Sequence, residues 1–192
     1  MNCICWNCRG LGNPWQVQEL SDIMKAKGHK LIFLMETKKK SAYLEKVRCW
    51  LKFDNLFVVP WRYLSGSLAL LWKNELDLHI WTFSPYHINA MVNPRIDDAW
   101  RITGIYGALE IVNWEDSWSL LHCLSSQLDF PWVCIGDFKK ITRLKEKLGG
   151  AIQLEKQMQD FKDCLDFCEF KDLDFTGLPF TCSNRRYEGL LV

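Results

Sequence analysis

Short apolar runs alternate along the chain with stretches in which apolar residues recur every three or four positions. Short runs bounded by turn residues are typical of strands. In one run, Ile88, Ala90 and Val92 alternate with Asn89 and Met91, which is the period of a strand. The strands that the pattern predicts cover residues 3–8, 31–35, 56–59, 68–72, 76–83, 87–92, 100–106 and 132–136.

Four helices are predicted between these strands. Asn13 and Pro14 suit the start of the first, because Asn is a good N-cap and Pro favours the first helical position. Gly28 suits its end. The second covers residues 40–51, and the third begins at Asn113. The last has an apolar stripe, formed by Leu154, Met158, Phe161, Leu165 and Cys168.

Alternating strands and helices indicate an α/β or α+β layered fold. The sequence has no internal repeat, low-complexity stretch or Pro/Gly/Ser linker, so we expect one domain over residues 1–192. With 48% hydrophobic and 24% charged residues, the composition is that of a globular protein. The longest clean apolar run, Leu31–Met35, is far too short to cross a membrane.

Charge and cysteine usage narrow the setting. A net charge of +1 provides no general basic field, so any nucleic-acid binding would use a local patch. Nine cysteines, with no visible signal peptide, favour a reducing, intracellular location. The group Cys3, Cys5 and Cys8 invites a metal-binding interpretation, but buried free thiols are the expectation that we favour.

Three predicted strands end in a polar residue: Asn7, Glu36 and Asp137. Strand ends of layered α/β folds present side chains to a shared crevice. Two carboxylates and an amide there are suited to a hard divalent ion, which prefers oxygen ligands. The alternative is that Glu36 and Asp137 only cap the turns that follow them.

These residues lie within six motifs that together resemble the endonuclease/exonuclease/phosphatase superfamily. More narrowly, the chain is similar to the N-terminal endonuclease domain of plant LINE-type (non-LTR) retrotransposons. The motifs occur in the family's order over almost the whole chain, at residues 6–12, 33–38, 66–72, 100–107, 135–138 and 180–184.

The resemblance implies a four-layered α/β sandwich, with two face-to-face sheets flanked by helices. It also implies hydrolysis of DNA phosphodiesters with Mg²⁺ or Mn²⁺. Glu36 would bind the metal, helped by Asn7. Asp137 would orient or deprotonate the attacking water, and Tyr106 would contact the phosphate or the departing oxygen. Asn184 would donate a hydrogen bond near the scissile phosphate.

A basic rim around these residues would contact the DNA backbone. The alternative for its lysines is an ordinary solvated face. The basic residues concerned are Arg9, Lys38, Lys39, Lys40, Lys139, Arg185 and Arg186.

The sequence departs from the family pattern in two places. Lys139 stands where the motif Gly-Asp-Phe-Asn has its final Asn, and a cation there would repel Mg²⁺. The Ser-Asp-His motif, with the strands around it, is absent up to Val192. We therefore expect impaired hydrolysis in a truncated domain. The alternative is a non-catalytic remnant that binds nucleic acid weakly, uses its exposed sheet edge for protein interaction, or has no selected role.

Other signals are weaker. Gly10 and Gly12 begin a dinucleotide-binding fingerprint that Trp15 interrupts, so we expect no nucleotide cofactor. A retroelement origin is compatible with the nucleus, and the sequence leaves the oligomeric state open. We expect the tryptophans to pack in the core or against the sheets rather than to contact DNA. They include Trp61, Trp81, Trp100, Trp114 and Trp118.

Overall fold

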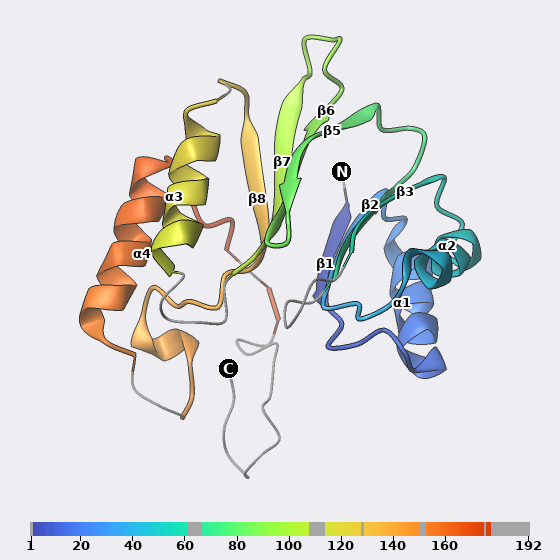
Figure 1. The fold of residues 1–192 in the computed structure, drawn as a ribbon, viewed down its shortest axis with the longest axis horizontal. Helices are drawn as coiled ribbons and strands as arrows, with labels where there is room; N and C mark the ends of the chain where they lie inside the picture. Colours follow the sequence, from blue (N-terminus) through green and yellow to red (C-terminus); the bar gives the residue numbers. More distant parts are fainter. Residues whose placement is uncertain are drawn as a thin grey trace. The chain divides into compact units, whose positions relative to one another are not determined.

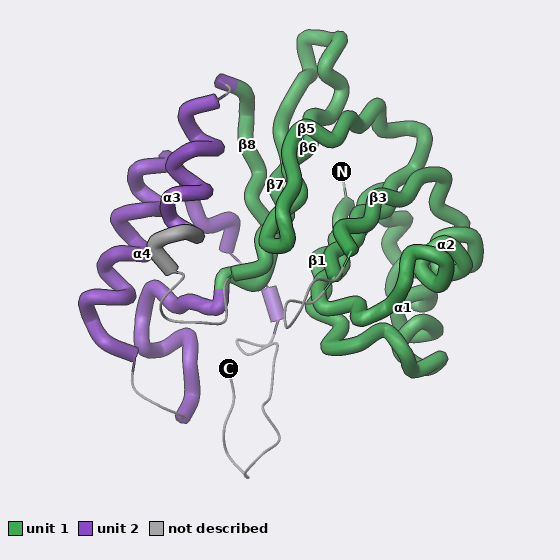
Figure 2. The backbone as a smooth tube through the Cα atoms, viewed as in Figure 1, with its two compact units in different colours: residues 1–107, 130–138 green, residues 108–129, 139–192 purple. Residues whose placement is uncertain are grey.

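The computed structural model describes residues 2–60, 67–107, 114–127, 129–149, 153–174 and 176–177. The chain divides into two compact units (Figure 2). Unit 1 comprises residues 1–107 and 130–138, and unit 2 comprises residues 108–129 and 139–192.

The first sheet of unit 1 is mixed and has the strand order β1-β2-β4-β3. Strands β1 and β2 are parallel, whereas β4 is antiparallel to both β2 and β3. Every residue of β2 is buried, as its uninterrupted apolar sequence predicts. The bounds are Cys3–Asn7 for β1, Leu31–Met35 for β2, Asn55–Val59 for β3 and Leu68–Trp72 for β4.

The second sheet has the order β5-β6-β7-β8 and mirrors this arrangement. Strand β6 is antiparallel to both β5 and β7, and β8 is parallel to β7. Each sheet of unit 1 therefore contains one parallel pair, β1 with β2 and β7 with β8 (Figure 1). The bounds are Leu78–Ser84 for β5, His87–Val92 for β6, Trp100–Tyr106 for β7 and Trp132–Asp137 for β8.

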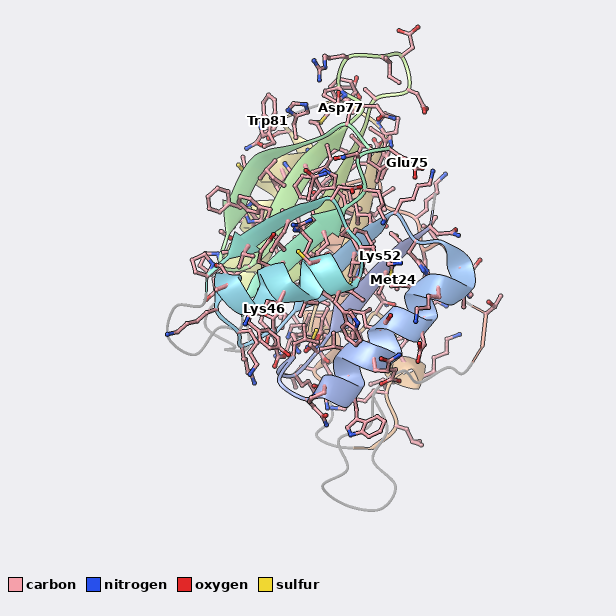
Figure 3. All side chains as sticks on the ribbon, turned by 90° about the vertical axis from the view of Figure 1, so that its right-hand side faces the viewer. Met24, Lys46, Lys52, Glu75, Asp77 and Trp81 are labelled. Carbon is pink, nitrogen blue, oxygen red and sulfur yellow. The ribbon has the colours of Figure 1, made fainter. Side chains whose placement is uncertain are left out.

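Helices α1 (Pro14–Lys27) and α2 (Ser41–Trp50) cover one face of the first sheet (Figure 3). They bury an apolar cluster against that face. Burial of aliphatic side chains contributes about 1.5–3 kcal/mol each, so this cluster is a principal source of stability. Its members include Val17, Leu20 and Met24 of α1, Leu44 and Val47 of α2, and Ile32, Leu34, Ala69 and Leu71 of the sheet.

The opposite face of the first sheet packs on the second sheet through another apolar cluster. Gly104 of β7 lies close to the first sheet, since a Cβ atom there would lie 2.5 Å from the ring of Phe33 on β2. Unit 1 is thus an α/β sandwich with helices outside its first sheet, which confirms the predicted fold class. Other members of the cluster are Leu31, Met35, Leu68 and Leu70 from one sheet, and Ile88, Ala90, Val92 and Ile102 from the other.

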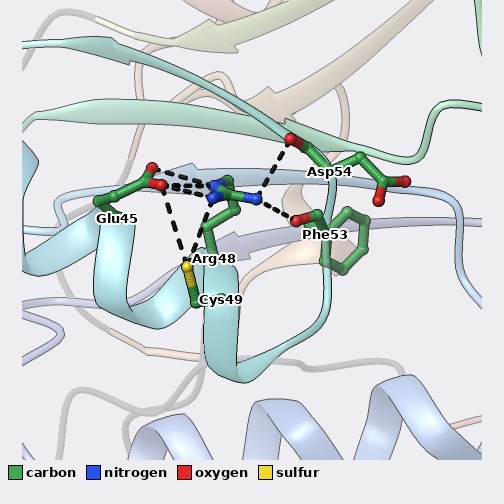
Figure 4. A network of polar contacts seen from close by, with 5 residues as sticks. All are labelled: Glu45, Arg48, Cys49, Phe53 and Asp54. Carbon is green, nitrogen blue, oxygen red and sulfur yellow. Dashed lines mark hydrogen bonds and ion pairs between the residues drawn. The ribbon is translucent and has the colours of Figure 1, made fainter.

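Local signals place the two helices. The side chain of Asn13 accepts a hydrogen bond from Trp15 N, and Gly28 N donates to Met24 O, as predicted for the two ends of α1. Near the end of α2, the guanidinium of Arg48 donates to Glu45 and to the carbonyl oxygen of Asp54 (Figure 4). This contact fixes the chain as it leaves the helix for β3.

Strand β6 is buried along its whole length, including its polar residues His87 and Asn89. The Asn89 side chain accepts a hydrogen bond from Thr103 Oγ1 at 2.9 Å, and Trp132 Nε1 donates to the same hydroxyl at 2.8 Å. Buried polar groups are tolerated when they are paired in this way. The alternating sequence of β6 therefore reflects two buried faces of different polarity.

A bulge in the neighbouring strand β5 falls between Ile80 and Thr82, at Trp81. Bulges redirect the side chains of a strand. Trp81 is 57% exposed and extends from the strand (Figure 3), which corrects the expectation that it packs against the sheet. Trp100, in contrast, packs on the cluster between the sheets, as predicted.

Unit 2 contains helices α3 (Trp114–Ser125) and α4 (Glu155–Phe167), with a short 3₁₀ helix at Leu144–Glu146. The rings of Trp118 and Phe161 stack with their centroids 4.9 Å apart, so α3 and α4 pack together. The half-buried Trp118 thus packs on the last helix, as predicted. The predicted apolar stripe is confirmed for the buried Met158, Phe161 and Cys168, but Leu154 is 65% exposed and precedes the helix, so its inclusion was wrong. The side chain of Trp114 and the whole of Trp61 lie outside the described residues.

Element positions agree closely with the predicted ones. The strand expected at residues 76–83 begins later, at Leu78. This difference does not change the order of elements. Among the described helices, none has the length and apolar character needed to span a membrane.

Substituting Gly104 with Ala tests the close approach of the sheets. The added methyl group meets the Phe33 ring, so the free energy of unfolding should fall by about 1–3 kcal/mol. Urea denaturation measures this loss. In a Phe33→Leu background the loss from Gly104→Ala should be smaller, because the ring is gone, and equal losses in both backgrounds would contradict the contact.

Candidate active site

Two parallel strand pairs, one in each sheet, end in polar residues. Asn7 is the last residue of β1, and Glu36 directly follows β2. In the other sheet, Tyr106 and Asp137 are register partners at the last position of β7 and β8. Parallel strands that run together also end together, which explains how each pair presents its polar residues side by side.

The side chain of Asn7 joins the two sheets. Its amide nitrogen donates hydrogen bonds to Glu36 Oε1 at 2.8 Å and to Asp137 Oδ2 at 2.9 Å. Tyr106 Oη donates to the same Glu36 oxygen at 2.8 Å. Four residues that the sequence analysis selected thus form one hydrogen-bonded group, and they come from β1, β7, β8 and the end of β2.

The loop after β1 runs beside the loop after β2, and backbone hydrogen bonds join the two loops. Gly10 N donates to Glu36 O at 2.7 Å, and Leu11 N donates to Thr37 O at 2.8 Å. The fully buried Thr37 also contacts Ser67 through both side-chain hydroxyls, and its N–H donates to Ser67 O. Sequence reasoning did not assign a role to Thr37 or Ser67, although both fall within the family-like motifs.

Several backbones at the site adopt the left-handed conformation that non-glycine residues avoid. The φ angles are +50° at Arg9, +51° at Glu36 and +51° at Lys38. Such conformations cost energy and persist where the surrounding structure fixes them. Gly136, before Asp137, is required for another reason, because a Cβ atom there would lie 1.9 Å from Ile105 O.

Electrostatics keep the hydroxyl of Tyr106 neutral. Burial raises the pKa of the phenol above its ordinary value, and the hydrogen bond to Glu36 and the negative charges of Glu36 and Asp137 raise it further. Tyr106 therefore acts as a hydrogen-bond donor at neutral pH. Burial, followed by the charge of Glu36, also raises the pKa of the Cys8 thiol to about 12, so this thiol stays protonated.

The three N-terminal cysteines differ in exposure, although all were expected to be buried. Cys8 is buried, Cys3 is half-buried and Cys5 is exposed, so the expectation of three buried thiols is wrong for Cys5. All three thiols are free. Within the part of the chain that the structure describes, no three His, Cys, Asp or Glu side chains gather into a metal-binding group.

The predicted rim residues have different positions. Lys38 Nζ lies 3.4 Å from Glu36 Oε2, and the exposed Arg9 donates its backbone N–H to Asn7 Oδ1 at 3.1 Å. Lys139 belongs to unit 2, where its backbone has a φ of +57°. The residues Asn184, Arg185 and Arg186 lie outside the described residues.

Alkaline titration tests the environment of Tyr106. Because its pKa is raised in the folded chain, the phenol stays protonated as pH passes 10, where an ordinary tyrosine is half ionised. The phenolate absorbance of the native chain minus that of Tyr106→Phe should therefore show no ionisation of this residue near pH 10. In urea, the same difference should show ordinary ionisation.

The raised pKa also predicts a pH dependence of stability. Tyr106 contributes its full stabilisation below pH 10, and that contribution is lost as pH rises toward the folded-state pKa. The free energy of unfolding should fall more steeply above pH 10 in the native chain than in Tyr106→Phe. Parallel curves would show that the phenol is not held in a neutral form.

No protein-family model and no curated protein sequence matches the chain. Solved structures do match in fold. The AP endonuclease LMAP from Leishmania major aligns with 85% of this chain and 65% of its own, at 14% identity and a TM-score of 0.61. The 3'-5' exonuclease NExo from Neisseria meningitidis aligns with 85% and 70%, at 15% identity and a TM-score of 0.63.

A third similar structure is the endonuclease domain of TRAS1, a telomere-specific non-LTR retrotransposon. It aligns with 86% of this chain and 69% of its own, at 9% identity and a TM-score of 0.59. The chain thus spans 65% to 70% of the length of these three structures. It has the α/β sandwich fold that these three nucleases share.

Proposed function

We propose that the chain is a metal-dependent phosphodiesterase domain of retroelement origin that acts on DNA and whose hydrolytic step is impaired. One observation carries this proposal. The Asn7 amide holds the carboxylates of Glu36 and Asp137 together, and the neutral Tyr106 donates to the Glu36 carboxylate. The group joins two acidic residues with donors and lies at the strand ends of a nuclease fold.

The residues fit a hard divalent ion such as Mg²⁺ or Mn²⁺. Two carboxylates that share one amide donor concentrate negative charge, which a divalent ion would neutralise. Mg²⁺ commonly binds one or two carboxylates and keeps several waters, so a three-acid cage is not needed. Glu36 would hold the ion. Asn7 would help through its amide oxygen, which requires that its amide group turn from the present orientation.

When bound, the ion would supply positive charge beside the phosphate oxygens. The protein's own residues would do the rest. Asp137, fixed by Asn7, would orient or deprotonate the attacking water. Tyr106, held neutral, would donate a hydrogen bond to the phosphate or the departing oxygen. Asn184 would donate near the scissile phosphate.

Similarity of fold supports DNA as the substrate class. The structures that resemble this chain include a retrotransposon endonuclease domain and a Neisseria 3' phosphatase bound to a product DNA hairpin. Arg9, Lys38 and Lys139, with Arg185 and Arg186, would contact the DNA backbone. Because the net charge is only +1, binding would depend on these local charges and would weaken with salt.

Lys139 is the reason to propose impairment. It stands two residues after Asp137, where the family motif has an Asn, and its cation would oppose a divalent ion. Its backbone φ of +57° is a conformation in which Asn is enriched and Lys is not. The backbone at this position is therefore one that Asn adopts more readily than Lys does.

A non-catalytic remnant is the second candidate. Lys139 favours it, since one change in a catalytic group that acts as a unit removes most of the activity. Such a remnant would bind nucleic acid weakly or use its exposed sheet edge for protein contacts. Edge strand β5 carries the exposed Trp81, which suits that second use.

Substitution Lys139→Asn, followed by a plasmid-nicking assay with Mg²⁺ or Mn²⁺, tests the proposal. We expect little nicking by the native chain and an increase of about tenfold or more in the variant, because an amide replaces an opposing cation. Adding Glu36→Gln or Asp137→Asn to the variant should abolish nicking. Lys140→Asn, which changes the charge at the next position, is the matched control.

The outcomes separate the two candidates. Nicking by the native chain that needs both metal and Glu36, and that Lys139→Asn leaves unchanged, would overturn the proposed impairment. If neither the native chain nor Lys139→Asn shows nicking that depends on Glu36, the non-catalytic remnant is the better description.

A further inference from the structure

A cation of the protein itself already lies at the carboxylate of Glu36. Lys38 Nζ is 3.4 Å from Glu36 Oε2, on the oxygen that does not accept from Asn7 and Tyr106. The Glu36 side chain is only 14% exposed, whereas that of Lys38 is 56% exposed. The carboxylate is thus held by the sandwich, while the ammonium approaches it from the solvent side.

The backbone of the loop after β2 holds Lys38 near Glu36. Thr37, between the two residues, is anchored to Ser67 and to Leu11 N. Glu36 and Lys38 on either side of it both adopt left-handed backbone angles. The stem of Lys38 passes close to Gly10, where a Cβ atom would lie 3.8 Å from Lys38 Cδ. The ion pair follows from a fixed backbone as well as from the attraction between two opposite charges.

A divalent ion and the Lys38 ammonium compete for the same space. Mg²⁺ binds carboxylate oxygens at about 2.0–2.1 Å. An ion at Glu36 would therefore lie within a few ångströms of the ammonium, and the two cations would repel each other strongly unless the lysine moved. An ion pair with one exposed partner is weak, so the lysine can be displaced.

We propose that Lys38 acts as an exchangeable cation that occupies Glu36 in the metal-free chain and must leave when a divalent ion binds. This inference rests on the metal site of the proposed function. Lys38 thereby raises the concentration of divalent ion that the site requires. Its ammonium, once displaced, is available to an anionic ligand at the same site.

Direct metal binding tests the exchange without any measurement of activity. The Kd for Mn²⁺ can be measured on the full chain by the loss of the free-ion signal in electron paramagnetic resonance. We expect Lys38→Gln to bind Mn²⁺ about 3- to 10-fold more tightly than the native chain, because a competing charge is removed. Lys38→Arg, which keeps the charge, should stay near the native value.

Lys39→Gln is the matched control, since it removes the same charge from the next residue. The Lys39 ammonium lies over the ring of Tyr43, 5.1 Å from the centroid, whereas the ion pair with Glu36 is made by Lys38. This variant should change the Kd by less than Lys38→Gln. Equal effects of Lys38→Gln and Lys39→Gln would indicate a general charge effect and would overturn the exchange.

Glu36→Gln separates this inference from the proposed function. If Mn²⁺ binds the native chain and Glu36→Gln removes that binding, the site stands and the two lysine variants decide the exchange. If Glu36→Gln binds Mn²⁺ as well as the native chain does, the proposed metal site is wrong, and the inference falls with it.

Discussion

One amide group holds the candidate site together. Asn7 donates to Glu36 and to Asp137, which lie 29 and 130 residues away in the sequence and belong to different sheets. An amide suits this place because it has two N–H donors and no charge. An aspartate would add a third negative charge, and an alanine would leave two carboxylates facing each other without a donor between them.

The sheet architecture explains why one short side chain can reach both carboxylates. Each sheet contributes one parallel strand pair, and both pairs end at this group. The sheets must also be close, and the contact of Gly104 with the Phe33 ring provides that closeness. The hydrogen bonds at the ends of the sheets therefore depend on close packing between the sheets.

Much of this could be predicted from the sequence, and the reasons are specific. Asn7, Glu36 and Asp137 stand out because each is a polar residue at the end of an apolar strand, a pattern that is visible in the sequence itself. Tyr106 ends an apolar strand without a polar signal, and only the family resemblance selected it. Its hydrogen bond to Glu36 depends on a contact between sheets that no local pattern contains.

Other features escaped prediction for physical reasons. Thr37 and Ser67 support the Glu36 loop through a contact over 30 positions, and isolated hydroxyl residues carry no local signal. Trp81 is exposed because a bulge interrupts β5, and a bulge has no clear signature in an apolar run. Lys139 was noticed because it replaces an Asn of the family motif. Its left-handed backbone, with a φ of +57°, is a conformation that Asn adopts more readily than Lys.

We propose that the ends of the two sheets form one cation site. Mn²⁺ broadens the NMR signals of nearby nuclei, so titration of an isotopically labelled chain with Mn²⁺ shows directly where the ion binds. We expect the amide signals of Asn7, Glu36 and Asp137 to broaden together at the same low Mn²⁺ concentration. Broadening confined to one sheet, or no selective broadening at all, would contradict the account.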